Sequence, residues 1–175
     1  KKVVLYAPTF RGGGTGPQDM PDYRQLADCL GDRFGSEWVI LLRQHYFVAA
    51  RESKQEELVR DVSDYPDMQQ LLLIADCLIS DYSSCMWDYL LTGGPCFVYA
   101  KDLETYQDSD RSFFISPQEW PYPVAKDEQT LWKRIREFDA DDYQKKTAFH
   151  RQQYGSRDTG TGCEQVVQYM QRYLQ

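Results

Sequence analysis

Apolar and polar positions along the chain follow two alternating patterns. Short runs rich in Val, Ile and Leu are typical of buried parallel strands, and they recur between longer stretches with the apolar spacing of one helix face. The predicted strands are residues 3–7, 38–43, 58–62, 77–80 and 95–99. The predicted helices are residues 22–34, 68–74, 84–91, 130–138, 141–152 and 161–174.

This alternation predicts an α/β fold of Rossmann-like type, with a mostly parallel sheet covered by helices on both faces. In such sheets ligands bind beyond the carboxyl ends of the strands, so the residues that follow each strand are the ones to inspect. The 175 residues suffice for one domain with a substantial core. Residues 104–126 show no clear period, and we expect a long surface loop there.

The charge balance and the lack of long apolar runs narrow the class of protein. A net charge of −7 argues against a nucleic-acid-binding protein, although a small anion needs only a few local cations and aimed N–H groups. The chain contains no apolar run of about 18 to 20 residues, the length that crosses a bilayer. Because a core strand begins directly after Lys1-Lys2, we expect a piece of a longer protein.

The five cysteines, at positions 29, 77, 85, 96 and 163, form no C-x-x-C pair and have no histidine at metal-ligand spacing. This pattern argues against a zinc site and suits a reducing compartment. Cys77 and Cys96 fall in predicted central strands, where we expect them to pack.

The stretch SDYSSCMWDY, residues 80–89, is a strand that passes into a helix through Ser83 and Ser84. A helix start directs unpaired N–H groups outward and carries partial positive charge, so an anion can bind there. The alternative is that Ser83 is simply an N-cap. Asp88 follows Ser84 by one helical turn and can orient that serine, accept from a sugar or polyol hydroxyl, or make a structural hydrogen bond.

Other candidates also follow predicted strands. Thr9, Arg11 and the glycines of residues 12–16 could approach phosphate oxygens, although the stretch matches neither a Walker loop nor a full G-x-G-x-x-G and can equally be a flexible loop. Arg43 ends the second predicted strand and His45 follows it, where the histidine could move a proton or be structural. Arg111 is either a ligand-binding or a surface arginine. The other histidine, His150, lies in a polar late helix, where we expect it to be solvated.

Several segments together resemble a known family. They are VVLYAPTFR, LLRQH, RSFF and the central block VSDYPDMQQLLLIADCLISDYSSCMWDYLLTGGPCFVYAKDLETY. In order and spacing they are similar to the carboxyl-terminal half of the CDP-glycerol glycerophosphotransferases, which include teichoic acid polymerases. The resemblance covers nearly the whole chain; it is most specific in the central block and weaker after Phe114.

The resemblance implies that residues 1–175 form a single nucleotide-binding lobe, the second of a GT-B-type fold, whose partners are the first lobe, a CDP-glycerol donor and a lipid-linked acceptor. Family members transfer glycerol phosphate to an acceptor hydroxyl and release CMP. By this likeness Ser83 and Ser84 meet the diphosphate, with Thr9 and Arg11 across the cleft. Arg43 to His45 match an Arg-x-His-Pro stretch whose histidine is catalytic, and Arg111 lies near the donor phosphates.

The chain departs from the family pattern at several positions. Tyr46 replaces the proline after the histidine, Ser112 replaces a glycine, and residues 158–163 differ from the usual helix start. These differences concern fine substrate choice more than the class of donor. Whether His45 acts as a base or stabilises the leaving phosphate stays open.

Two alternatives remain: the donor lobe of a nucleotide-sugar glycosyltransferase, and a non-catalytic interaction module. The module hypothesis has to treat Arg11, His45, Ser83 and Ser84 at successive strand ends as coincidence. We expect no protein-bound cofactor, so any Mg²⁺ would come with the donor diphosphate. The resemblance places the full-length enzyme in the cytoplasm, peripheral to the inner face of the membrane. It also predicts that the isolated lobe turns over poorly.

Overall fold

The structure is a computed structural model that describes residues 1–9, 20–44, 57–109, 113–156 and 159–174. Its centre is a six-stranded sheet in the order β3-β2-β1-β4-β5-β6, and every neighbouring pair is parallel. The strands are β1 (Lys2–Ala7), β2 (Trp38–Leu42), β3 (Val59–Asp61), β4 (Cys77–Ser80), β5 (Cys96–Tyr99) and β6 (Val124–Ala125). This order confirms the predicted α/β fold and places a topological switch point between β1 and β4.

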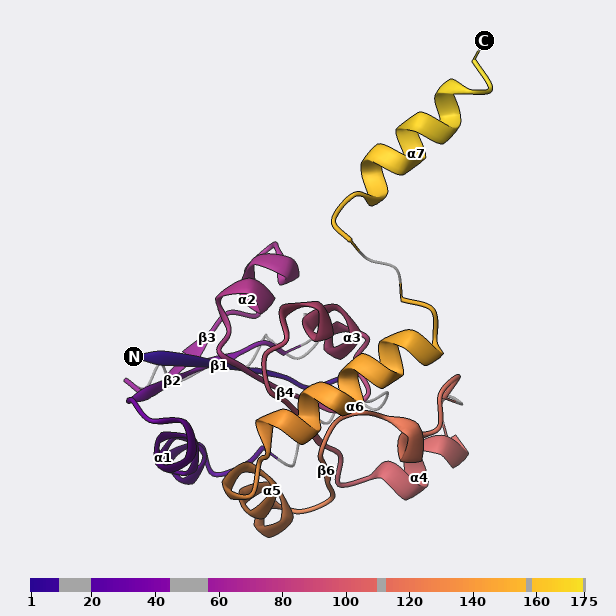
Figure 1. The fold of residues 1–175 in the computed structure, drawn as a ribbon. Coiled ribbons are helices and arrows are strands. Elements are labelled where there is room, and N and C mark those ends of the chain that lie inside the picture. Colours follow the sequence, from indigo (N-terminus) through magenta and orange to yellow (C-terminus); the bar gives the residue numbers. More distant parts are fainter. Residues whose placement is uncertain (10–19, 45–56, 110–112, 157–158, 175) are drawn as a thin grey trace.

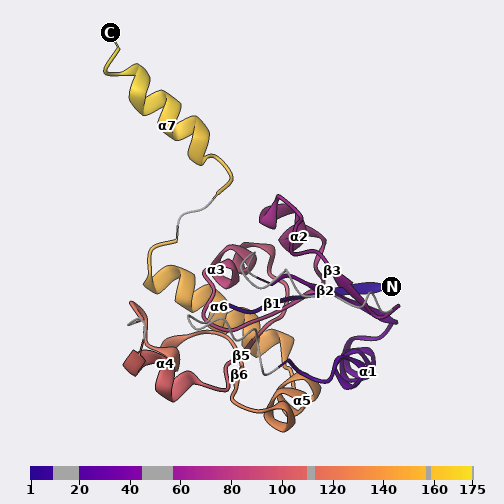
Figure 2. The ribbon, with the colours of Figure 1, turned by 180° about the vertical axis from the view of Figure 1, so that it is seen from behind.

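Helices lie on both faces of the sheet, as predicted (Figures 1 and 2). One face carries α1 (Tyr23–Phe34) and α5 (Glu128–Arg136), and the other carries α2 (Met68–Ile74) and α3 (Cys85–Tyr89). The structure describes five further helical segments. They are the 3₁₀ turn η1 (Leu90–Thr92), α4 (Leu103–Ser109), the 3₁₀ turn η2 (Pro117–Glu119), α6 (Ala140–Gln153) and α7 (Gly162–Gln171).

Four of the helices begin at an aspartate that caps their first turn. The carboxylates of Asp22, Asp67, Asp127 and Asp139 accept hydrogen bonds from backbone N–H groups two or three residues later. These bonds satisfy donors that a helix start otherwise leaves unpaired. An aspartate is thus the local sequence signal of where these four helices begin.

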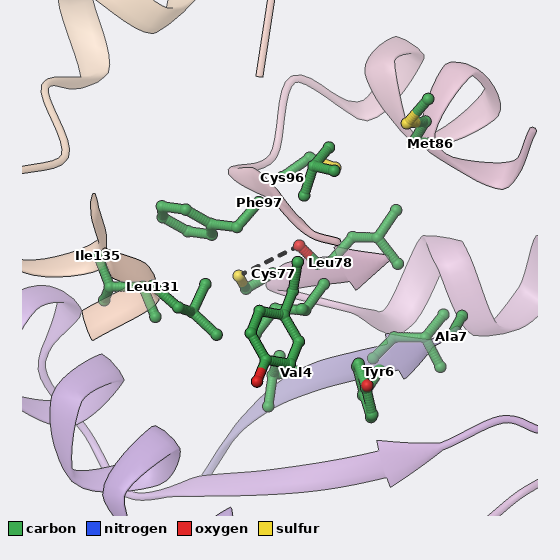
Figure 3. Close-up of a cluster of buried hydrophobic side chains, with 14 of the residues drawn as sticks. Val4, Tyr6, Ala7, Cys77, Leu78, Met86, Cys96, Phe97, Leu131 and Ile135 are labelled. Carbon is green, nitrogen blue, oxygen red and sulfur yellow. Dashed lines mark hydrogen bonds between the residues drawn. The ribbon is translucent and has the colours of Figure 1, made fainter. Parts of the chain in front are cut away.

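The core packs the strands of the sheet against helices on both faces, and Figure 3 shows the part of it around β1, β4, β5, α3 and α5. Leu78, Phe97, Leu131 and Ile135 are fully buried there. Cys77 and Cys96 are also fully buried, which confirms that they pack in the central strands. All five cysteines are free thiols.

The expectation of a long surface loop over residues 104–126 is wrong. This segment contains most of α4, the turn η2 and the edge strand β6. Trp120 and Tyr122 are buried, and the Tyr122 hydroxyl donates to the carbonyl of Met86 at 2.8 Å. The signal of the two-residue β6 is weak in the sequence because proline precedes it and its pairing partner β5 lies about 25 residues earlier.

Candidate functional site

The loops that follow β1 and β4 meet at the switch point of the sheet. Thr9, two residues beyond β1, donates from its backbone N–H to both carboxylate oxygens of Asp81, at 2.8 and 3.0 Å. Its hydroxyl also donates to Asp81, at 2.5 Å. The predicted site residue Thr9 is therefore fixed next to the β4–α3 turn, at the edge where open α/β sheets bind ligands.

The β4–α3 turn presents Ser83 and Ser84 at this edge. Ser83 is half-buried, and its hydroxyl accepts from the N–H of Cys85 at a long 3.4 Å. Ser84 occupies the N-cap position, is exposed and makes no side-chain capping bond. The hydroxyl that accepts from an N–H at the helix start is therefore that of Ser83, in line with the N-cap alternative, and capping does not occupy the Ser84 hydroxyl.

Asp88 lies one turn beyond Ser84 on α3 and is exposed. It lines a hollow of about 440 Å³ between α3, residues 113–120 and the end of α6. Its lining is mostly apolar and includes the aromatic side chains of Trp87, Trp120 and Tyr154. Tyr82 also lines this hollow, which therefore reaches the β4–α3 turn.

Arg43 follows β2 and is anchored by its surroundings. Its Nη1 donates to the carbonyl oxygens of Val62, Ser63 and Tyr65, at 3.0, 3.2 and 2.5 Å. The next residue, Gln44, donates from its backbone N–H to the Ser63 hydroxyl at 3.0 Å. The guanidinium thus ties the end of β2 to the turn after β3, and its role towards phosphate stays a prediction.

His150 is not solvated, contrary to the expectation from the polar sequence of its helix. Its side chain is buried and its ring stacks on Trp87, with centroids 4.9 Å apart and an interplanar angle of 9°. Burial lowers the pKa of His150 below its ordinary value, and the carboxylate of Glu119 opposes that shift. His150 therefore serves the packing of α6 on α3.

Three predicted site residues, Arg11, His45 and Arg111, lie outside the described residues. The neighbouring positions that are described, Thr9 and Gln44, lie at the carboxyl edge of the sheet. The proposed catalytic role of His45 and the phosphate contacts of the two arginines stay predictions.

Two residues of the β4–α3 turn, Asp81 and Tyr82, follow a predicted strand as the other candidates do, but they were assigned no role from the sequence. Asp81 is 3% exposed and accepts from Thr9, as described above. The Tyr82 hydroxyl donates to the carboxylate of Asp102, after β5, at 2.7 Å, and its ring stacks on Tyr106 with centroids 3.9 Å apart. A carboxylate that comes two residues after the apolar run Cys77-Leu78-Ile79 is the signal that could have drawn attention to Asp81.

Two further searches were limited to the part of the chain that the structure describes. Within it, no three His, Cys, Asp or Glu side chains gather in a way that could hold a metal ion. None of the described helices combines the length and the apolar character needed to cross a bilayer.

Comparison with known sequences gives consistent matches over the whole chain. The sequence model of a family described as CDP-Glycerol:Poly(glycerophosphate) glycerophosphotransferase matches residues 1–172. A teichoic acid glycerol-phosphate transferase of Staphylococcus aureus is 34% identical over 96% of this chain and 44% of its own length. A teichoic acid ribitol-phosphate primase of Bacillus spizizenii is 32% identical over 99% of this chain and 45% of its own length.

Solved structures show the same fold. The wall teichoic acid polymerase TagF superposes with a TM-score of 0.76 and 31% identity, over 98% of this chain and 44% of that one. A TagF variant soaked with CDPG superposes with a TM-score of 0.74 and 33% identity, over 98% of this chain and 43% of that one. This likeness confirms the GT-B-type character of the fold. The chain spans less than half the length of these relatives.

Proposed function

Because this chain belongs to the CDP-glycerol:poly(glycerophosphate) glycerophosphotransferase family, we propose that it is the donor-binding lobe of a transferase acting on teichoic-acid-type acceptors. The reaction would move glycerol phosphate from CDP-glycerol to an acceptor hydroxyl and release CMP. A related polyol phosphate is an equally good cargo, since relatives are named for both glycerol phosphate and ribitol phosphate.

One observation carries the proposal: Thr9 and the Ser83-Ser84 turn lie side by side at the switch point, bridged by Asp81. A diphosphate at this switch point would accept from the serine hydroxyls and from N–H groups at the start of α3. The CDPG-soaked TagF structure supports the choice of donor, because it shares the fold of this chain.

The reaction needs three contributions from the protein: positioning of the two reactants, neutralisation of charge on the phosphoryl oxygens, and removal of the proton of the acceptor hydroxyl. The acceptor oxygen bonds to the β-phosphorus while the bond from that phosphorus to the CMP oxygen breaks, and the hydroxyl proton must leave. Arg11, Arg111 and the β4–α3 turn would neutralise the phosphoryl oxygens, with the anchored charge of Arg43 nearby. His45 would take the hydroxyl proton or stabilise the leaving phosphate.

The remaining elements of the proposal concern the surroundings of the site. Asp88, exposed on α3, would accept from a sugar or polyol hydroxyl, since a carboxylate repels phosphate. A first lobe would complete the cleft and the acceptor would be lipid-linked, which places the enzyme at the cytoplasmic face of the membrane. No protein-bound cofactor is required, and Mg²⁺ would accompany the donor diphosphate.

The test is calorimetric titration of the 175-residue chain with CDP-glycerol, CDP, CMP, UDP and a sugar nucleotide. We expect cytidine-selective binding that Ser84→Ala weakens about tenfold, the loss of one hydrogen bond to a charged group. Ser36→Ala, an exposed serine before β2 at the other edge of the sheet, is the matched control.

Other outcomes would point elsewhere. Preference for the sugar nucleotide would favour a glycosyltransferase lobe. If no nucleotide binds at millimolar concentration, the titration is repeated with an amino-terminal lobe from a relative. Continued absence of binding would support an interaction module and overturn the transferase proposal.

A further inference from the structure

Asp81 and Tyr82 extend from the β4–α3 turn towards two different loops. In the sheet β4 lies between β1 and β5, and the two side chains contact the loops of these two neighbours. Asp81 accepts from Thr9 after β1, and Tyr82 donates to Asp102 after β5. Both residues directly precede Ser83 and Ser84, so the turn that carries the serines is held from two sides.

The bonds of Asp81 are numerous for one side chain. Its Oδ1 accepts from the N–H and the hydroxyl of Thr9 and from the N–H of Tyr82, at 2.8, 2.5 and 2.6 Å. Hydrogen bonds to an ionised carboxylate are stronger than neutral ones, and burial to 3% exposure shields them from water. Asp81 is therefore a rigid connection between the two loops.

These bonds extend the pairing of β1 with β4 beyond the sheet. The last register pair is Ala7 with Ser80, where the Ser80 hydroxyl also donates to the Ala7 carbonyl at 2.7 Å. Asp81 and Thr9 continue the connection to the switch point. Beyond the last register pair, the contacts of the Asp81 side chain thus hold Thr9 next to the turn that carries the serines.

We propose that Asp81 is a positioning residue for the donor phosphates. It acts through Thr9 and the β4–α3 turn, which it holds at a fixed separation, because a buried carboxylate cannot itself contact phosphate favourably. The inference rests on the proposed function and adds to it the residue that sets the geometry of the donor site. The positioning role is inferred from the contacts of Asp81 with Thr9 and Tyr82, and not from the amino-acid composition of the turn.

The chain offers a matched control at the opposite edge of the same two strands. Asp76, just before β4, accepts from the N–H of Val3 in β1 at 2.8 Å. Asp76 and Asp81 thus both tie β1 to β4 through a carboxylate and a backbone N–H. Only Asp81 does so at the carboxyl edge, where the donor is proposed to bind.

The experiment compares Asp81→Asn with Asp76→Asn in the 175-residue chain through two measurements. The amide hydrogen-exchange rate of Thr9 reports how firmly Asp81 restrains the loop after β1. Titration with CDP-glycerol reports the affinity of the donor site. An Asn amide at position 81 would present an N–H where Oδ2 now accepts from Thr9, so we expect at least tenfold faster Thr9 exchange and at least tenfold weaker donor binding. Asp76→Asn should change neither.

Several results would overturn the inference. Unchanged Thr9 exchange in Asp81→Asn would show that the carboxylate does not hold the loop. Faster Thr9 exchange with unchanged donor affinity would show that the restraint by Asp81 does not position the donor. Equal losses of donor affinity in Asp81→Asn and Asp76→Asn would show the same. If Asp81→Asn does not fold, Asp81→Glu, which keeps the charge but moves it by one methylene, serves the same comparison.

The two proposals fail in different ways. A wild-type chain that binds no donor, alone or with an amino-terminal lobe, contradicts the proposed function. The Thr9 exchange measurement needs no donor, so it still supports or overturns the part of the inference that concerns the loop.

Discussion

His150 lies in the interior of the protein, 5% exposed, with its ring between Trp87 and Tyr154. Its Nε2 has no hydrogen-bond partner among the described residues. A buried imidazole without a partner favours the neutral form, because the charged form loses its hydration. The folded protein therefore binds a proton at His150 less readily than the unfolded chain does.

This difference predicts a pH dependence of stability. Since burial lowers the pKa of His150 in the folded state, its contribution is fully present above about pH 6.5 and declines as the pH falls towards the folded value. His150→Phe keeps an aromatic ring against Trp87 and removes the titration. We expect urea midpoints of the wild type to fall more between pH 7 and pH 5 than those of the variant; identical profiles would contradict the assignment.

Single residues also show which features of the candidate site can be predicted from the sequence. Thr9 was predicted at the ligand edge because it follows a strand, and the structure places it there. The burial of His150 and the anchoring of Arg43 depend on segments far away in the sequence, Trp87 on α3 and the carbonyls after β3. A pattern of neighbouring residues contains no information on such contacts.

At the scale of elements, Gly94, in the connection between η1 and β5, packs closely against Tyr89 at the end of α3. A Cβ at this position would lie 2.2 Å from the Tyr89 hydroxyl oxygen and 2.7 Å from its Cζ. Tyr89 is fully buried, and its hydroxyl donates to the Ala75 carbonyl at 3.0 Å. The ring therefore has little freedom to move away, and only glycine fits between the two elements.

Gly94→Ala should accordingly destabilise the fold. We expect a loss of about 1–3 kcal/mol in the free energy of unfolding, the usual range for overpacking a core. Gly162→Ala is the control, because nothing lies within 4 Å of a Cβ there, and it should stay within about 0.5 kcal/mol of the wild type. Equal denaturation midpoints for the two variants would show that Tyr89 can adjust.

The elements differ in how well the sequence predicts them. Five strands and six helices were predicted near their observed places, because most of them carry a local apolar pattern. The helix α4 and the strand β6 were missed. A strand as short as β6 (Val124–Ala125) has no period of its own and exists only through its pairing with β5.

At the scale of the whole molecule, the strand order determines which loops meet. The sequence pattern predicted a parallel sheet but contained no rule for placing β1 beside β4, which starts about 70 residues later. That pairing creates the switch point and brings Thr9 to the β4–α3 turn. The candidate site is therefore a property of the topology as much as of its residues.

The carboxyl-terminal helix α7 differs from all others, because it lies apart from the sheet and its helices (Figures 1 and 2). Every residue of α7 is exposed, including an apolar stripe that continues beyond its end. The most exposed large apolar side chains of this segment are Val166, Val167, Tyr169, Met170, Tyr173 and Leu174. A helix of 10 residues without tertiary contacts is marginal in water, where isolated helices need about 12–15 residues.

We therefore predict that α7 is unprotected in the isolated 175-residue chain. Amides of α7 should exchange at nearly the rate of an unfolded peptide, whereas α5, only 9 residues long, should be protected because Leu131 and Ile135 are fully buried. Hydrogen exchange by mass spectrometry at low protein concentration compares the two helices in one experiment. Protection of α7 equal to that of α5 would contradict the prediction and would require the apolar stripe to be covered. Loss of that protection on dilution would then identify a second copy of the chain as the cover.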